Sequence, residues 1–401
     1  MIKTILASAA FLAALPLSAA VDTDSTATDS IKGLKFTDIH TVKTTSVKDQ
    51  NKSGTCWCFA GTSFFEDEIL RQGGDSLDLS EMFTVWHTYD EKAERFVRNY
   101  GGVNFAPGGS LIDVAHVWKK YGAVPEEVYT GLQYGEDKHV HGELDGILSA
   151  MLNVIVKKPN KKISKAWRTA ERGVLDAYLG KLPESFTYKG KKYTPQSFAA
   201  SLPIRVEDYV TISSFTHHPF YENFVLEVPD NWLAGQYFNV PMDEMKAVVD
   251  NAIAKGYPVA WAADVSEGGF KWNKGVALMP KGKTEGDMDG TELSRWVKLS
   301  DKERQNDKYN FDGPVDEITV TQEMRQDMYD SQETTDDHGM EIVGIATDQN
   351  GKRYYKVKNS WDTNQVYGGF IYVSEAFFLA KTVGIYVHRD AVPAATAKKM
   401  K

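Results

Sequence analysis

The pattern of apolar and polar positions changes abruptly after the polar loop at residues 50–55. Phe59, Ala60, Ser63 and Phe64 occupy positions i, i+1, i+4 and i+5 and so form one largely apolar face, which predicts an amphipathic helix. Gly73 and Gly74 are typical of a helix end, so this helix is expected to run from about Cys56 for five turns. Cys56 therefore stands at or just before a helix N-terminus, where unpaired N–H groups favour an anion and lower the pKa of a thiol.

Further periodic segments predict an α+β fold, with helices in the first half and an antiparallel sheet at the C-terminal end. Ser80 is the expected N-cap of a second helix, and Ser110 with Asp113 forms a capping-box-like start of a third. The remaining predicted helices are 144–156, 165–179 and 241–256, and the predicted strands are 36–48, 258–264, 338–346, 353–359, 368–373 and 383–387. Residues 348–351 predict a hairpin turn between the strands at 338–346 and 353–359.

The N-terminal twenty residues differ in kind from the rest of the chain. Lys3 provides a positive charge, residues 4–17 are apolar, and Ser18-Ala19-Ala20 supplies small residues, which together predict a secretory signal peptide at 1–20. The alternative, a membrane anchor, needs a longer apolar run, and no other segment reaches membrane-spanning length. We expect a flexible leader at 21–35, a main domain at 36–393 and a short basic tail at 394–401.

Composition narrows the function. The 401 residues are 42% hydrophobic, enough for one large or two modest domains, and removal of Lys3 with the signal peptide leaves 45 basic against 55 acidic side chains. A chain this acidic is not expected to bind nucleic acid. The two cysteines, Cys56 and Cys58, are two positions apart, a spacing that strains a disulfide, so the core is expected to hold the fold together.

Three residue types of a nucleophilic site occur in an order that a hairpin can bring together. Taken alone, Cys56 reads as a small buried apolar residue. However, His338 lies at the mouth of one predicted strand and Asn359 ends its partner, and a Cys-His-Asn set needs such a meeting. In this arrangement His338 takes the thiol proton to give a thiolate–imidazolium pair, and Asn359 orients the imidazole. Cys58 is expected to pack in the core.

The segments around these residues resemble the papain-like cysteine peptidases. The matching motifs are Gln50 with Gly54-Thr55-Cys56-Trp57, His338-Gly339-Met340, and Lys358-Asn359-Ser360-Trp361. The resemblance implies a helical subdomain led by the cysteine helix and an antiparallel sheet or barrel subdomain carrying His and Asn.

The same resemblance implies further roles around the cysteine. Gln50 and the N–H of Cys56 form the oxyanion hole, Trp361 shields the His–Asn hydrogen bond, and Gly108 with Gly109 lets the substrate backbone approach closely. A simple turn is the alternative for the two glycines.

Within this family the chain resembles the bleomycin hydrolase and aminopeptidase C branch. Cys56 and His338 are 282 positions apart, against roughly 130–150 in papain and the cathepsins. The excess matches a middle insertion at about 126–240, and Ser53 replaces a cysteine that forms a disulfide in many secreted members. Residues 252–264 also resemble that branch. The branch removes single residues from peptide N-termini and assembles as a hexamer.

Two positions depart from the branch. Its C-terminal arm lies in the cleft, where the terminal carboxylate receives the substrate amino group, but the tail after Pro393 is short and basic here. Asp362 stands where the family usually has glycine. The expected absence of an inhibitory propeptide between Val21 and the cysteine segment, by contrast, resembles the branch. A signal peptide is unusual in it, because its members are mostly cytosolic.

The sequence therefore predicts an exported, periplasmic or secreted cysteine aminopeptidase acting on peptides, without metal or cofactor and with a homo-hexamer implied by resemblance. The alternatives are a papain-like endopeptidase or dipeptidyl-peptidase and, from another class, a catalytically silent binding or scaffold protein. The pairs His139/His141 and His217/His218 lack a complete ligand set in the sequence and are expected to be structural.

Overall fold

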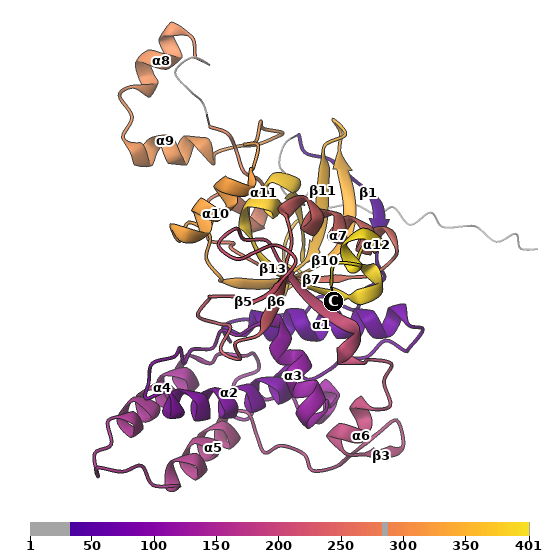
Figure 1. Ribbon diagram of the computed structural model, residues 1–401, viewed down its shortest axis with the longest axis vertical. Coiled ribbons are helices and arrows are strands. Elements are labelled where there is room, and N and C mark those ends of the chain that lie inside the picture. The colour runs from indigo at the N-terminus through magenta and orange to yellow at the C-terminus, as the bar shows by residue number, and fades with distance from the viewer. Residues whose placement is uncertain (1–32, 283–287, 401) are drawn as a thin grey trace, which may run out of the picture.

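The computed structural model describes residues 33–282 and 288–400 (Figure 1). The predicted signal peptide, most of the predicted leader and Lys401 lie outside the described residues. Near the end of the predicted leader, Leu34 is 3% exposed and the N–H of the exposed Lys35 donates to Gln349 Oε1. Leu34 joins a buried apolar cluster, which attaches this end of the predicted flexible leader to the main domain.

The N-terminal helices form one half of the molecule and the sheet forms the other (Figure 1). Local signals set these helices: Ser80 Oγ caps α2, and Ser110 and Asp113 form a complete capping box at α3. The helices of this half are α1 (Cys56–Arg71), α2 (Glu81–Arg98), α3 (Leu111–Tyr121), α4 (Gly142–Val156), α5 (Ala166–Tyr178) and α6 (Pro195–Ala199), the last beside the small hairpin β2 (Phe186–Tyr188) and β3 (Lys191–Tyr193).

The second half is built on an eleven-stranded sheet. Its central pairs are antiparallel as predicted, with the turn after Asp348 joining β10 to β11. Two pairs, β4/β6 and β12/β9, are parallel, which the sequence did not indicate. The strands are β1 (Phe36–Thr41), β4 (Tyr209–Ser213), β5 (Asn223–Val225), β6 (Gln236–Asn239), β7 (Val259–Ala263), β8 (Phe270–Lys271), β9 (Val276–Ala277), β10 (His338–Asp348), β11 (Arg353–Lys358), β12 (Phe370–Ser374) and β13 (Thr382–His388).

The predicted middle insertion contributes elements to both halves of the molecule. Its first part makes α4 to α6, whereas its last part supplies β4, β5 and β6 to the main sheet through the pairing of β4 with β13. The remaining helices lie on the sheet side: α7 (Met242–Ala254), α8 (Gly290–Trp296), α9 (Asp301–Lys308), α10 (Gln322–Asp330), α11 (Glu375–Lys381) and α12 (Ala394–Ala397). Helices α8 and α9 project from one end of the molecule (Figure 1).

Helix α1 lies between the two halves and is buried on every side. Each residue from Trp57 to Leu70 is buried, so the helix has no solvent face, in contrast to the single apolar face that the sequence predicts. The buried acids at its centre are paired: Glu66 with Lys48 at 2.8 Å, and Glu68 with Arg71 at 2.7 Å. Within the described residues, no helix has both the length and the apolarity needed to cross a membrane.

Candidate active site

Cys56 is the first residue of α1, as the sequence predicts, and is partly exposed. The turn before it depends on Gly54, which has φ +69° and whose added Cβ would meet the ring of Pro107 at 2.9 Å. Backbone N–H groups of Trp57 and Gly339 hydrogen-bond the sulfur and lower its pKa. The nucleophile candidate thus has two fixed donors beside a helix N-terminus, an arrangement that stabilises negative charge on sulfur.

The hydrogen bonds of Asn359 determine the tautomer of His338. The N–H of Ser360 donates to Asn359 Oδ1 at 2.8 Å, so that atom is an acceptor and His338 Nε2, also 2.8 Å away, must carry the hydrogen. The neutral imidazole then has its lone pair on Nδ1. This is the tautomer that a base needs to accept a thiol proton while Asn359 holds the opposite nitrogen.

Trp361 covers this pair. Its ring lies 4.5 Å from the His338 ring, centroid to centroid, and it is supported edge-on by Trp272 at 5.3 Å and Phe270 at 6.0 Å. His338 is 5% exposed and Asn359 3% exposed, so the hydrogen bond between them is screened from water. A protected bond of this kind is stronger than one in solvent.

Gln50 is held beside the same loop. The Ser360 hydroxyl donates to Gln50 Oε1 at 2.7 Å, and the backbone N–H of Gln50 donates to the Ser360 carbonyl at 2.8 Å. The carbonyl end of the side chain is therefore occupied, and its Nε2 has no hydrogen-bond partner among the described residues. That leaves the amide hydrogens available for an incoming oxyanion. Ser360, which sequence reasoning named only as part of a motif, is what orients Gln50.

A cleft of about 470 Å³ contains both halves of the site. It is lined by Cys56, His338, Gly108 and Gly109, so the structure brings the nucleophile, the base and the glycine pair to one place. The distant segments meet because α1 packs directly on β10, the strand that begins with His338.

The two glycines are required by their protein neighbours. A Cβ at Gly109 would lie 2.7 Å from Asp113 Oδ2 and 2.8 Å from the Trp57 ring, and one at Gly108 would lie 2.0 Å from Asp230 Oδ2. Neither glycine has a positive φ. Close packing against Trp57, rather than a turn conformation, therefore explains the glycine at 109, whereas a side chain at 108 would displace the Asp230 carboxylate.

Burial favours the uncharged form of both catalytic candidates, Cys56 and His338. It raises the pKa of the Cys56 thiol to about 12, against the effect of the two N–H donors, and it lowers the pKa of His338 to about 4. Asp336 and Asp230 raise the thiol pKa further through their negative charge. Each shift opposes the thiolate–imidazolium pair that the sequence predicts, because removal from water disfavours each charge separately.

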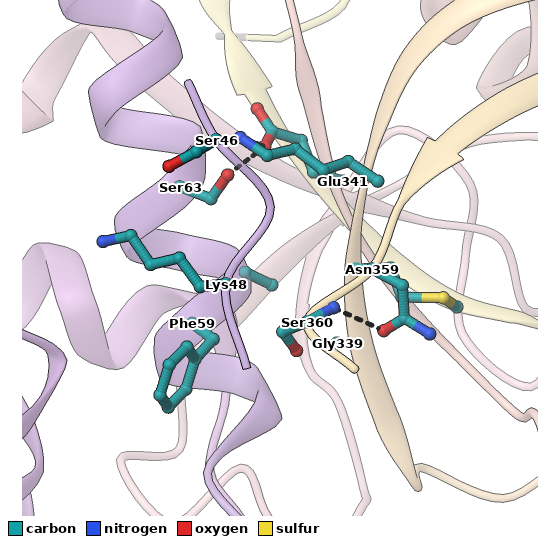
Figure 2. Close-up of a pocket in the computed structure, with 11 residues that line it drawn as sticks. Ser46, Lys48, Phe59, Ser63, Gly339, Glu341, Asn359 and Ser360 are labelled. Atoms are coloured by element: carbon teal, nitrogen blue, oxygen red, sulfur yellow. Dashed lines mark hydrogen bonds and ion pairs between the residues drawn. The ribbon is translucent and has the colours of Figure 1, made fainter. Parts of the chain in front are cut away.

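A buried polar layer lies behind the catalytic side chains, in a second cavity between α1 and the strands β10 and β11 (Figure 2). Ser63 of α1 donates to Glu341 Oε2 at 2.6 Å, and Lys358 Nζ lies 3.6 Å from Asp67 Oδ2. Glu341 follows His338 by three residues, and Lys358 directly precedes Asn359. These contacts therefore anchor the two catalytic strand ends to the cysteine helix.

Substitution of Gly339 by alanine is expected to damage the site through the backbone. The new Cβ would lie 3.0 Å from the Cα and 3.2 Å from the N of Trp57, and helix backbone cannot rotate away. We expect kcat/KM to fall about tenfold to a hundredfold, because small displacements between reacting groups are costly. Gly146→Ala is the matched control, since nothing lies within 4 Å of its added Cβ and alanine suits the interior of α4. Equal activity of the two variants would contradict the close packing of α1 on β10.

The other cysteine and the histidine pairs lie outside the cleft. Cys58 is fully buried, with its Sγ 3.3 Å from the Glu81 carbonyl, as predicted for a core residue, and both cysteines are free thiols. His139 is 8% exposed and His141 is fully buried, and burial lowers the pKa of each to about 4. The backbone of these two residues binds the loop that carries Gln50, since the N–H of Lys52 donates to the His139 carbonyl and the N–H of His141 donates to the Lys52 carbonyl.

His217 and His218 gain a carboxylate neighbour that the sequence did not reveal, Glu227, and the three offer ligand atoms within 4.8 Å of one another. The hydrogen bonds argue against metal binding. Gln326 Oε1 accepts the N–H of Thr216, so its Nε2 donates to His217 Nδ1 at 3.0 Å. His217 then carries its hydrogen on Nε2 and donates it to Glu227. That nitrogen has no lone pair for a metal, which agrees with a structural role.

A thiol at a helix start, facing an oriented imidazole across a cleft between a helical half and a sheet, defines a papain-like cysteine peptidase. The Peptidase C1-like family matches residues 14–280 and 288–401. The chain belongs to this family, in its bleomycin hydrolase and aminopeptidase C branch.

Curated relatives are similar over most of their length. Aminopeptidase C of Lactobacillus delbrueckii subsp. lactis is 23% identical over 382 residues, covering 84% of this chain and 78% of that protein. Aminopeptidase C of Streptococcus thermophilus is 22% identical over 391 residues, covering 87% of this chain and 81% of that protein. The crystal structure of PepW from Lactobacillus rhamnosis HN001 superposes with a TM-score of 0.67 at 20% identity, covering 91% of this chain and 84% of that one. The papain-like α+β fold predicted from the sequence is thereby confirmed.

Proposed function

We propose that this protein is an exported cysteine aminopeptidase that removes N-terminal residues from peptides through an acyl-enzyme. The observation that carries the proposal is the cleft in which the Cys56 thiol and His338, oriented by Asn359, face the Gly108–Gly109 segment. The relatives called aminopeptidase C support the exopeptidase reading.

The proposed reaction begins with attack of Cys56 Sγ on the carbonyl carbon of the first peptide bond. The thiol proton moves to Nδ1 of His338, and the carbonyl oxygen becomes an oxyanion that accepts hydrogen bonds from Gln50 Nε2 and the Cys56 N–H. When the C–N bond breaks, His338 returns the proton to the leaving amine. A water molecule then attacks the thioester with His338 as base, which releases the amino acid and restores the thiol.

Proton transfer to His338 is proposed to yield a thiolate–imidazolium pair even though burial disfavours each charge alone. Three effects work in its favour: the mutual attraction of the two charges, the N-terminus of α1, and the N–H donors of Trp57 and Gly339. Asn359 contributes as well, because its hydrogen bond raises the pKa of His338.

The pH dependence of Cys56 alkylation by iodoacetamide shows whether the thiolate–imidazolium pair or the neutral pair prevails. A thiol whose pKa is about 12 reacts tenfold faster for each pH unit gained, whereas a thiolate stabilised by imidazolium reacts at a nearly constant rate around neutral pH. We expect a plateau near pH 7 for the native protein. The control, His338→Ala, removes the charge partner and should show a rate that rises steadily with pH. A steady rise in both proteins would contradict the ion pair and make proton transfer concerted with attack.

Cleavage position decides between the aminopeptidase and its alternatives. The aminopeptidase is expected to release alanine from alanyl-aminomethylcoumarin and to leave the N-acetylated substrate intact. Mass analysis of an unblocked decapeptide should show losses of one residue at a time. Losses of two residues would indicate a dipeptidyl-peptidase, and internal fragments an endopeptidase. A folded protein that neither turns over any substrate nor reacts with a thiol-directed inhibitor would be the silent scaffold.

Export and assembly form a separate part of the proposal. The apolar segment after Lys3 supports export to the periplasm or beyond, and N-terminal sequencing of the mature protein should begin at Val21. Recovery of intact Met1 in the cytoplasmic fraction would oppose export. Resemblance to the branch supports a hexamer, which light scattering would detect as six times the mass of one chain.

A further inference from the structure

The cleft beside Cys56 is lined by three carboxylates: Asp230, Asp336 and Asp337. Asp337 is engaged, since it accepts the N–H groups of Val265 at 2.8 Å and Ser266 at 3.3 Å. Asp336 has no hydrogen-bond or cationic partner among the described residues, and it is half-buried at the cleft wall. A partly desolvated carboxylate without a partner is stabilised when a ligand supplies positive charge.

Asp230 reaches the same cleft from the predicted middle insertion. Its Oδ2 lies directly over Gly108, because a Cβ at that glycine would be only 2.0 Å from it. Among the described residues, the one side-chain donor to Asp230 is neutral, Asn104 Nδ2 at 3.1 Å. The nearby Lys92 instead directs its ammonium group at the carbonyls of Ala106 and Gly108, 2.5 Å from each. Within that part of the chain, Asp230 thus has no direct ion pair at the edge of the glycine segment.

The charges of these groups act on one another and on the nucleophile. Asp230, Asp337 and Asp113 add to the effect of burial and raise the pKa of Asp336 to about 8. Asp336 and Asp230 also raise the pKa of the Cys56 thiol, so both lie close enough to sense the sulfur. A cation bound between the two carboxylates would relieve their repulsion and remove a force that opposes thiolate formation.

The C-terminal tail does not occupy this place. Thr396 and Lys399 both bind Glu244 of α7 at 2.8 Å, and Met400 lines a separate cavity beside Tyr209 and Phe238. Within the described residues, none from the tail lines the cleft that holds Cys56. The carboxylates that face the cleft therefore come from within the domain.

We propose that Asp336 and Asp230 form the subsite that binds the α-ammonium group of the substrate. This inference rests on the proposed aminopeptidase function, in which every substrate carries an ammonium group one residue from the scissile bond. Asp336 precedes His338 by two residues, which places the anchor beside the base. Asp230, lying on Gly108, also occupies the path that a longer N-terminal extension would follow. Charge and steric closure together restrict cleavage to the first residue.

The test compares the native protein with Asp336→Asn, Asp230→Asn and the double variant, using Asp75→Asn as the control because the Asp75 side chain is 87% exposed. The substrates are alanyl-aminomethylcoumarin, its N-acetyl form and the propionyl form that lacks the amino group. Active sites are counted with an irreversible thiol inhibitor, so that a misfolded variant is recognised by lost labelling. We expect KM for the free-amino substrate to rise about tenfold or more in Asp336→Asn, with kcat changed much less. The preference over the propionyl substrate should fall by the same factor.

The outcomes separate this inference from the proposed function. A native protein without preference for a free amino group contradicts the aminopeptidase itself. A native preference that survives in the double variant, with full thiol labelling, overturns the ammonium subsite alone. A fourth substrate, acetyl-lysyl-alanyl-aminomethylcoumarin, checks the source of the cation. If its cleavage depends on Asp336 while that of the free-amino substrate does not, the subsite binds a lysine side chain, and the α-ammonium assignment is wrong.

Discussion

Replacing Cys56 by alanine is expected to reduce kcat by at least about 10⁴-fold while leaving the fold intact, because the remaining hydrogen-bond donors cannot form an acyl-enzyme. Cys56 is partly exposed and begins α1, so removal of its sulfur leaves the buried stretch Trp57–Leu70 untouched. The measurement is steady-state hydrolysis of alanyl-aminomethylcoumarin together with a thermal unfolding curve.

Cys58→Ala provides the matched control for that experiment. The second thiol is fully buried against the Glu81 carbonyl and does not line the cleft, so its removal should lower the melting temperature with kcat nearly unchanged. Turnover retained in Cys56→Ala but lost in Cys58→Ala would reverse the assignment of the nucleophile. Turnover retained in both would exclude thiol catalysis.

Replacing Gln50 by alanine is expected to lower kcat about 10²- to 10³-fold with a small change in KM, the effect of losing one oxyanion donor. The basis is the fixed orientation of Gln50: Ser360 binds its Oε1 and leaves Nε2 without a partner in the described chain. Because the oxyanion exists only after attack, the lost interaction stabilises the transition state and not the bound substrate.

Two further variants sharpen the oxyanion test. Ser360→Ala removes the hydroxyl that orients Gln50 and should lower kcat by a smaller factor, with alkylation of Cys56 unaffected. Gln196→Ala, on the exposed face of α6, is the control for loss of a glutamine side chain. A tenfold rise in KM with unchanged kcat in Gln50→Ala would show that the residue binds substrate and does not stabilise the oxyanion.

The predicted middle insertion contributes to the wall of the cleft and so bears on specificity. The insertion accounts for the long separation of Cys56 and His338, and its last part both extends the sheet and carries Asp230 onto Gly108. Two described tail residues, Thr396 and Lys399, bind Glu244. An internal carboxylate in the cleft would therefore supply an anchor for the substrate that does not depend on these tail residues.

Much of the fold was predictable because its signals are local. Ser80 and the Ser110/Asp113 pair mark helix starts through bonds within one turn, and the glycine after Asn350 marks the hairpin between β10 and β11. The order of Cys56, His338 and Asn359 likewise reflects chemistry that permits few residue types. The structure places His338 and Asn359 on adjacent strand ends, with His338 in the same cleft as Cys56.

The sequence by itself thus predicted the long helices, the central antiparallel strands and the papain-like fold, and it named the residues of the candidate site. It extended the first strand to residue 48, whereas β1 ends at Thr41, and it did not predict β4, β5 and β6. Tertiary structure alone decided how those residues are surrounded. Helix α1 carries three consecutive acids, Glu66 to Glu68, and all three are buried. Lys48 and Lys358 come from other segments and lie against Glu66 and Asp67, whereas Arg71 of the same helix pairs with Glu68. Asp230 and Asp336 are ordinary polar residues in the sequence. Asp230 reaches the cleft because the insertion folds back over Gly108, and Asp336 reaches it from the loop before β10. Long-range charge pairing and desolvation depend on distances that no local pattern contains, and they are what set the electrostatics of this site.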